Sequence, residues 1–213
     1  MNRQIRQLAV GLMTCYVVLV VALKYWQVGQ EEDLNANVEN TRAVRREFNK
    51  PRGPIVTSDG VVVARSIESV DADGDTIRLR EYPTGDVLAH ATGYFTLNFG
   101  STQVERTHGD VLTGSTTEQQ VRSLGDLLSG EVDNSGSVQL AIRHDLQQVA
   151  KFLLGNRTGS VAVIEVETGA VRALWSNPSY DPGTFVNAPF EEAQETIIEL
   201  QNADDDPLLS DAY

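Results

Sequence analysis

The sequence has one cysteine and three histidines among its 213 residues, and both shortages narrow the chemistry that it can support. Cys15 has no second cysteine to pair with, so no disulfide can form within the chain, and cysteine gives no information about the redox compartment. The histidines, His90, His108 and His144, are not spaced as zinc ligands are, either from one another or from Cys15. We therefore predict structural roles for these histidines, and we expect neither a metal site nor a cofactor.

Lysine is also scarce, with three residues in the whole chain. A serine nucleophile can use a lysine one helical turn later as its base, which gives the pattern S-x-x-K. The positions three residues before the lysines hold Val21, Glu47 and Gln148, so this pattern is absent. The patterns S-x-N and K-T-G are absent as well, and no serine follows a glycine at the spacing of a nucleophile elbow. We therefore expect no catalytic residue in this sequence.

Basic residues are few overall: 17 lysines and arginines face 30 acids, for a net charge of −13. The first 29 residues hold Arg3, Arg6 and Lys24 and no acid, so they carry +3 of that total and the rest carries −16. An acidic body is poorly suited to nucleic acid, because binding requires basic residues that displace counterions. It is equally unsuited to lying flat on anionic lipid, so we interpret the acidity as a solubility feature.

An apolar segment near the N-terminus predicts a membrane anchor. Residues 8–23 form a run of sixteen residues without charge, and neighbouring apolar residues extend it over 5–28. About 20 residues cross a bilayer, and Lys24 can extend its ammonium to the headgroups beside the interfacial pair Tyr25 and Trp26. Arg3 and Arg6 favour a cytoplasmic N-terminus. We predict a single transmembrane helix in the plasma membrane that contacts the bilayer through residues 5–28, with the bulk of the chain outside the cytoplasm.

Three alternatives to this anchor are weaker. A cleaved signal peptide requires small residues at the cleavage site, but the bulky sequence KYWQVGQ follows the apolar run. Lipid attachment to Cys15 requires a small residue before it, where Thr14 stands, and the apolar run continues beyond that point. A buried helix of a soluble protein would have no polar face here.

The remaining patterns predict a mixed α+β fold. Turn residues Ser58, Asp59 and Gly60 separate strand-like runs at 55–57 and 61–64, and Asp73-Gly74 separates a second pair. Further along the chain we predict short strands and loops at 82–114, a helix at 117–128 that begins with a capping box, a strand at 137–142, strands at 160–166 and 170–176, and a helix from Pro189 to about 201.

One further helix is predicted between 145 and 154, with Asp145 as its N-terminal cap and Gly155 as its end. Its expected apolar face is formed by Leu146, Val149, Ala150, Leu153 and Leu154.

The pattern D-x-D-x-D at residues 71–75 invites comparison with a calcium loop. The sixth position of such a loop requires glycine and the twelfth requires glutamate, but Thr76 and Tyr82 stand there. We therefore interpret this segment as a solvated hairpin.

Several short motifs follow one another in a fixed order. In chain order, the motifs are Asn40-Thr41-Arg42, Arg52-Gly53-Pro54-Ile55, Asp59-Gly60, Val63-Ala64, Tyr82-Pro83, the run 89–94, Phe99-Gly100, Val104-Glu105, Leu146-Gln147 and the run from 159 to 182. This order resembles the class B penicillin-binding proteins, which are peptidoglycan D,D-transpeptidases, and in particular the actinobacterial penicillin-binding protein A type.

The resemblance implies three parts. These are a cytoplasmic tip and anchor at 1–29, a non-catalytic pedestal or dimerisation-type domain at 30–157, and the start of a transpeptidase domain at 158–213. It also implies a structural pedestal motif that consists of Arg52, Gly53, Ile55, Asp59, Gly60, His90, Gly93, Tyr94, Gly100 and Glu105. For Arg52 two roles remain open: a buried, hydrogen-bonded brace, which we favour, or an exposed partner contact.

The resemblance further implies that the nucleophilic serine of such a protein lies beyond Tyr213, so that this chain is inactive alone. A full-length protein would bind peptidoglycan stem peptides and β-lactams, cross-link by serine acyl transfer, and contact partner proteins of cell-wall synthesis or division. The alternative is a complete but catalytically dead scaffold outside the cytoplasm that binds cell-wall partners.

Overall fold

The computed structural model describes residues 2–24, 49–70, 76–117, 119 and 135–212. The chain forms two compact units, Met1–Glu47 and Phe48–Tyr213. In the first unit, helix α1 spans Asn2–Lys24, and its described side chains are exposed. Within the part of the chain that the structure describes, no helix is long and apolar enough to cross a membrane.

The second unit contains a four-stranded sheet with the order β3-β2-β1-β6. Its strands are β1 (Ile55–Val56), β2 (Val62–Val70), β3 (Thr76–Glu81) and β6 (Val138–Gln139). Strand β1 pairs antiparallel with β2 and parallel with β6, and β2 pairs antiparallel with β3. The predicted hairpin around Asp59 is therefore present, while the predicted strand at 137–142 is shorter than expected. The predicted turn at Asp73-Gly74 and most of the predicted helix at 117–128 lie outside the described residues.

The segment from 82 to 114 corrects the prediction of strands and loops. It contains the short helices η2 (Gly85–Leu88), α4 (Ala89–Thr92), α5 (Gln103–Thr107) and α6 (Gly109–Thr113), with one small hairpin of β4 (Phe95–Thr96) and β5 (Gly100–Ser101). Helices of four or five residues are not stable by themselves. Burial of Leu88, Glu105 and Leu112 holds them in place, which is tertiary information that a local pattern does not carry.

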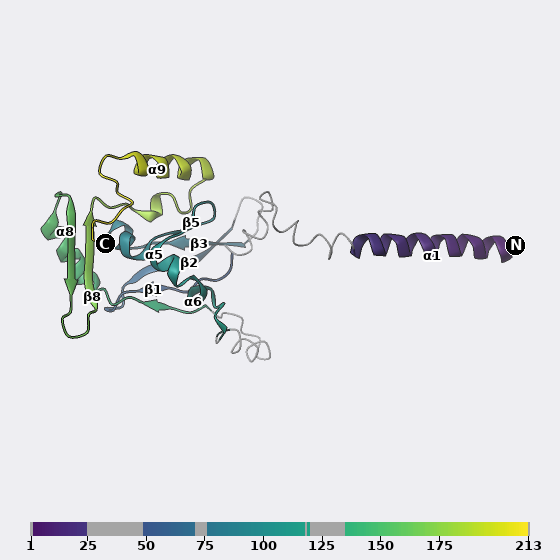
Figure 1. Cartoon of the computed structure of the whole chain (residues 1–213), viewed down its shortest axis with the longest axis horizontal. Coiled ribbons are helices and arrows are strands. Elements are labelled where there is room, and N and C mark those ends of the chain that lie inside the picture. The colour runs from purple at the N-terminus through teal and green to yellow at the C-terminus, as the bar shows by residue number, and fades with distance from the viewer. Residues whose placement is uncertain (1, 25–48, 71–75, 118, 120–134, 213) are drawn as a thin grey trace. The chain divides into compact units, whose positions relative to one another are not determined.

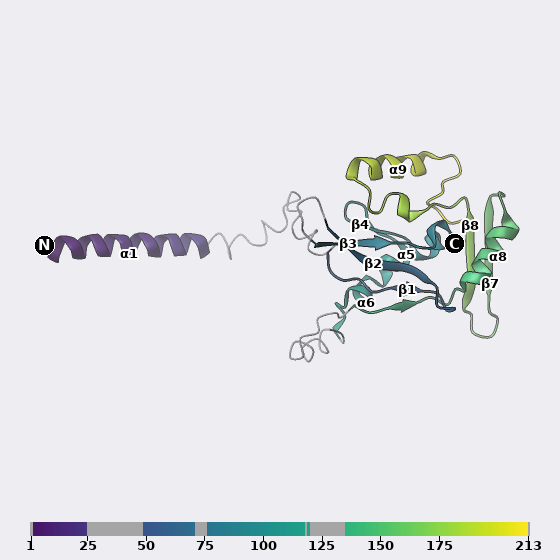
Figure 2. The same ribbon diagram turned by 180° about the vertical axis from the view of Figure 1, so that it is seen from behind.

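A separate hairpin consists of β7 (Gly159–Ile164) and β8 (Val171–Asn177), close to the predicted bounds. Helix α8 (His144–Leu154) packs on one face of this hairpin, as Figures 1 and 2 show from opposite sides. Its contact face includes buried Ala150, which packs against Trp175. The predicted apolar face is wrong at Val149 and Leu153, which are 52% and 64% exposed. The contact face instead includes the buried polar residue Gln147.

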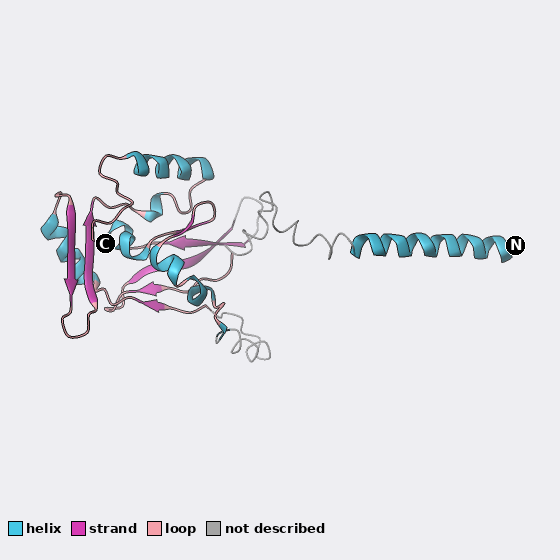
Figure 3. Cartoon of the chain, in the orientation of Figure 1, coloured by secondary structure: helices cyan, strands magenta, loops and turns pink. Residues whose placement is uncertain are grey.

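After β8 the chain returns to the first sheet through η3 (Pro182–Thr184) and α9 (Phe190–Asn202), the helix predicted after Pro189. Figure 3 shows the resulting mixture of helices and strands, as the predicted α+β class requires.

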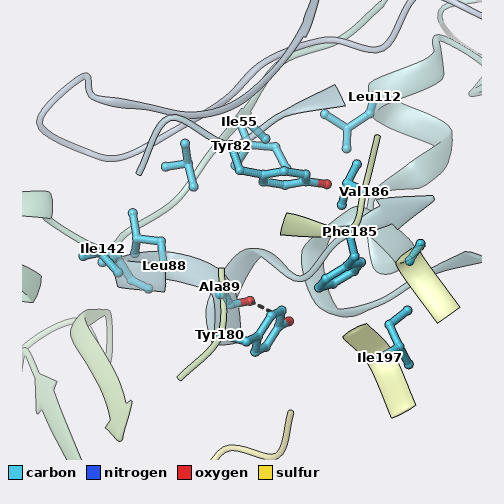
Figure 4. Packing of buried hydrophobic residues seen from close by; sticks show 14 residues of the cluster. Ile55, Tyr82, Leu88, Ala89, Leu112, Ile142, Tyr180, Phe185, Val186 and Ile197 are labelled. Atoms are coloured by element: carbon cyan, nitrogen blue, oxygen red, sulfur yellow. Dashed lines mark hydrogen bonds between the residues drawn. The ribbon is translucent and has the colours of Figure 1, made fainter. Parts of the chain in front are cut away.

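One hydrophobic core extends across the predicted boundary at 157/158. Figure 4 shows fully buried Ile55 and Leu112 in the same cluster as Tyr180, Phe185 and Ile197. The division into a pedestal and a transpeptidase domain stays a prediction, but the two segments share their apolar interior. The pedestal segment therefore has part of its core supplied by residues that follow it by more than 20 positions.

Candidate functional site

A buried carboxylate lies between two arginines at the centre of the predicted motif. Glu105, in α5, has 0% of its surface exposed. Arg52 Nε donates to its Oε2 at 2.6 Å, and Arg80 Nε donates to its Oε1 at 2.8 Å. Arg52 Nη2 also donates to the main-chain oxygen of Glu105. One carboxylate thus connects the segment before β1 to strand β3 through charge-assisted hydrogen bonds.

The two arginines also hold the main chain of the motif. Arg80 Nη1 donates to the carbonyl oxygens of Arg52 and Gly53, at 3.1 and 2.9 Å. The guanidinium of Arg52 lies over the ring of Phe95, 4.2 Å from its centroid. With 7% of its surface exposed, Arg52 matches the buried brace and not the exposed contact.

Tyr82 completes this group, which we call the arginine–glutamate cluster: Arg52, Arg80, Tyr82 and Glu105. The Tyr82 hydroxyl donates to Glu105 Oε1 at 3.2 Å and accepts from the Phe95 amide at 2.9 Å. Burial, assisted by the negative charge of Glu105, raises the pKa of Tyr82 well above its usual range, so the phenol stays protonated. Both carboxylate oxygens are already hydrogen-bonded, so the cluster can fix geometry but offers no free base.

Two glycines of the motif lie where no side chain fits. A Cβ on Gly53 would lie 2.0 Å from the carbonyl oxygen of Gly136. Gly93 has φ +73°, and a Cβ there would lie 2.5 Å from the carbonyl oxygen of Thr102. Gly60 and Gly100, at φ +83° and +74°, occupy positions in which glycine is favoured.

Asp59 caps the N-terminus of α8 from the distant β1–β2 turn. Its carboxylate accepts from the amide of His144, at 2.9 Å to Oδ1, and from the amide of Asp145, at 3.3 Å to Oδ2. Burial raises the pKa of this carboxyl, but the hydrogen bonds together outweigh it and lower the pKa from 3.8 to about 2. The prediction that Asp145 is the cap is therefore wrong: Asp145 lies inside the first turn and pairs with Arg143.

His90 and Tyr94 belong to an aromatic group that includes Tyr180 and Phe185. His90 packs edge-on against Tyr180 with centroids 5.5 Å apart, and Tyr94 does so against Phe185 at 5.1 Å. His90 Nε2 lies 3.2 Å from the carbonyl oxygen of Pro178, and burial lowers the pKa of His90. The predicted motif residues His90 and Tyr94 thus pack against the loop that follows β8.

Sequence reasoning missed Arg80, and it named Gln147 only as part of the motif Leu146-Gln147, without a buried bridging role. Gln147 has one usable signal, because it stands at i, i+3 and i+7 with Ala150 and Leu154, so a polar residue occupies the buried face of a helix. Arg80 has no comparable signal, since alternate charged residues in a strand usually face solvent. The predicted motif Asn40-Thr41-Arg42 lies outside the described residues.

A shallow pocket of about 600 Å³ lies beside the cap. Its lining residues are Ser58, Asp59, Arg143, Leu146, Glu165 and Arg172. Its arginines are already paired, Arg143 with Asp145 at 2.6 Å and Arg172 with Glu165 at 2.9 Å. In the described ranges, no three His, Cys, Asp or Glu side chains gather as a metal ion would require.

Known proteins match this chain over the regions that contain these motifs. Residues 52–138 match the family model described as "Penicillin binding protein A dimerisation domain". The chain is 32% identical over 217 residues to peptidoglycan D,D-transpeptidase PbpA of Mycolicibacterium smegmatis, a match that covers 100% of this chain and 43% of that protein. It is 33% identical over 192 residues to PbpA of Mycobacterium tuberculosis, covering 88% of this chain and 38% of that protein.

The structure of penicillin-binding protein A from M. tuberculosis, in its imipenem acyl-enzyme complex, has the same fold. The TM-score is 0.71 at 29% identity, over 77% of this chain and 38% of that one. The fold and the motifs therefore make this chain a member of the class B penicillin-binding proteins. Within that class, the chain is homologous to the penicillin-binding protein A type, and it spans less than half the length of these relatives.

Proposed function

We propose that this chain provides the pedestal and the first part of the transpeptidase domain of a penicillin-binding protein of peptidoglycan synthesis. In the whole protein, a serine nucleophile would cross-link stem peptides by acyl transfer and would be acylated by β-lactams. The observation that carries this proposal is the fold shared with an imipenem acyl-enzyme, at a TM-score of 0.71 over 77% of this chain.

In this proposal, residues 30–157 form the non-catalytic pedestal and 158–213 begin the transpeptidase domain. The ten motif residues named from the sequence are structural, and the arginine–glutamate cluster supports that role because both oxygens of its carboxylate are hydrogen-bonded to internal donors. Partner proteins of cell-wall synthesis or division would contact the exterior of this pedestal and not its buried motif.

The edges of the β7–β8 hairpin support the assignment of 158–213 to a larger sheet. The outer edge of β8 is closed, because Arg143 N donates to Arg172 O at 2.9 Å and the side chain of Gln147 bonds both main-chain groups of Leu174. Among the described strands, β7 pairs only with β8. A further strand can therefore add along β7, as the first strand of a larger antiparallel sheet would require.

We also propose that residues 5–28 anchor the chain in the plasma membrane, with the N-terminus cytoplasmic and the bulk outside. The uncharged run at 8–23 supports the span, and Arg3 and Arg6 before it support the orientation. The chain's single cysteine gives a test, because Cys15 lies within that run. In lipid vesicles a water-soluble maleimide should leave Cys15 unmodified, whereas a cysteine introduced by Arg3→Cys, in a Cys15→Ser background, should react. Equal reaction of both thiols in vesicles would contradict the anchor.

Fluorescent penicillin tests the catalytic part of the proposal. The 213-residue chain should remain unlabelled, and the product of the whole natural reading frame should be labelled covalently. Labelling of the 213-residue chain would contradict its predicted inactivity. A stop codon directly after codon 213 would instead favour the catalytically dead scaffold, and a frame that continues into Y-P-P-G-S-x-x-K would favour the transpeptidase.

A further inference from the structure

Gln147 is a fully buried amide with three hydrogen bonds to main-chain groups. Its Nε2 donates to Val87 O at 2.8 Å and to Leu174 O at 2.6 Å, and its Oε1 accepts from Leu174 N at 2.8 Å. None of these partners belongs to α8, the helix that carries Gln147. The side chain thus connects η2, which precedes it by 60 residues, to β8, which follows it by 27.

The bonds to Leu174 imitate a neighbouring strand. A residue in a β-ladder offers one N–H and one C=O, and the amide of Gln147 supplies the complementary acceptor and donor to both groups of one β8 residue. Leucine at 147 would supply neither group. An ionised glutamate would supply only the acceptor and would face two carbonyl oxygens.

Two other contacts lie beside this amide. Lys151 Nζ, one turn further along α8, pairs with Asp86 Oδ2 at 2.5 Å. Ser179 Oγ, just after β8, donates to the carbonyl oxygen of Asp86 at 2.9 Å. We call Asp86, Val87, Gln147, Lys151 and Leu174 the joint, because these residues connect η2, α8 and β8.

We propose that Gln147 is a positioning residue that locks η2 to β8, so that the pedestal segment and the transpeptidase hairpin move as one body. A displacement of η2 must carry β8 with it or leave a buried main-chain group without a partner, which is costly. The proposal rests on the proposed function only in assigning β8 to the transpeptidase domain. The joint is tested without any β-lactam, so its failure and that of the proposed function are distinguishable.

Amide hydrogen exchange in the 213-residue chain, held in detergent micelles, tests the joint. In Gln147→Leu, the protection factor of the Leu174 amide should fall at least tenfold, and protection in η2 should fall with it. The β2–β3 ladder should keep its protection. The matched control is Gln148→Leu, which places the same substitution on the exposed neighbour and should change neither region. Unchanged exchange at Leu174, or an equal loss in the β2–β3 ladder, would overturn the proposal.

Gln147→Glu provides a second test that does not depend on how well the leucine variant folds. When protonated, glutamate offers one O–H donor and one carbonyl acceptor, so it can restore the pair with Leu174. The melting temperature of this variant should therefore approach that of the wild type as the pH falls from about 7.5 to about 5, since burial raises the pKa of a carboxyl group. A difference in melting temperature that is constant or grows over this range would contradict the requirement for a donor at position 147.

Discussion

Glu105 is the centre of the arginine–glutamate cluster. Its carboxylate accepts hydrogen bonds from Arg52, Arg80 and Tyr82 and has no exposed surface. A buried ion pair contributes little net stability compared with apolar residues of the same volume, but removal of one partner leaves buried charge unpaired. The cluster therefore specifies how the segment before β1 meets β3 more than it adds stability.

The substitution Glu105→Gln should lower the free energy of unfolding by about 3–5 kcal/mol, because it leaves two buried guanidiniums without a counter-charge. Chemical denaturation measures the change. Glu81→Gln is the matched control: it removes a carboxylate from an exposed pair with Arg65 and should cost at most about 1 kcal/mol. Equal losses of unfolding free energy in the two variants would show that burial of the cluster does not increase the cost of losing a carboxylate.

The cap at Asp59 predicts a dependence of stability on pH. The pKa of its carboxyl is lowered from 3.8 to about 2 in the folded chain, so the stabilisation is fully present above the unfolded pKa and is lost as the pH falls toward 2. The difference in unfolding free energy between the wild type and Asp59→Asn should therefore shrink from about pH 5 to about pH 2. Carboxyl ¹³C titration gives the direct check, and a titration midpoint near 4 would disprove the cap.

At the scale of elements, sequence patterns were enough to predict the strands and helices whose formation depends on residues close by in the sequence. Strands β7 and β8 join through a short turn at Gly169, and α9 follows Pro189, so alternation and a helix-start residue were enough to find them. The helices between 85 and 113 were missed because their stability comes from burial against the sheet. The cap of α8 was misassigned because its acceptor lies 85 residues away in the sequence.

Some residues of the candidate site could be predicted from the sequence, but the contacts between them could not. Arg52 and Glu105 were found through motif order, yet nothing local indicated that they meet across 53 positions. Arg80 and the buried role of Gln147 were missed because a polar side chain in a strand or helix is normally solvated, and only the tertiary contacts show that these two side chains are buried.

Helix α8 exposes an apolar face that should cause self-association. Phe152 is 84% exposed, and Val149 and Leu153 on the same helix are also exposed. Exposed apolar groups of this kind favour association in water. Phe152→Glu should therefore reduce the sedimentation-detected oligomers of residues 48–213, whereas Gln148→Glu, which adds the same charge without removing apolar surface, should reduce them less. An equal effect of both substitutions would attribute the change to charge alone.

At the scale of the whole molecule, the chain leaves the first sheet after β6, forms α8 and the β7–β8 hairpin, and then returns to the first sheet. Tyr180, Phe185 and Ile197 enter the core that contains Ile55 and Leu112. The segment that bears the pedestal motif is consequently incomplete without residues that follow β8.

A chain that ends at residue 157 should therefore fail to unfold cooperatively on heating. It would lack the core residues Tyr180, Phe185, Val186, Ala193 and Ile197. Circular dichroism and dye binding measure the change, with a chain that ends at residue 202 as the control that keeps this part of the core. A sharp melting transition in the shorter chain would establish 30–157 as an independently folding domain.

The cap at Asp59 also bears on the order in which the chain folds. Its contact with His144 closes a loop of 85 residues, and long loops close late because of their entropy. We therefore expect Asp59 to cap α8 late in folding, so that Asp59→Ala accelerates unfolding while leaving the refolding rate nearly unchanged. Stopped-flow chevron analysis separates the two rates, and a slower refolding limb would place this contact in the folding nucleus instead.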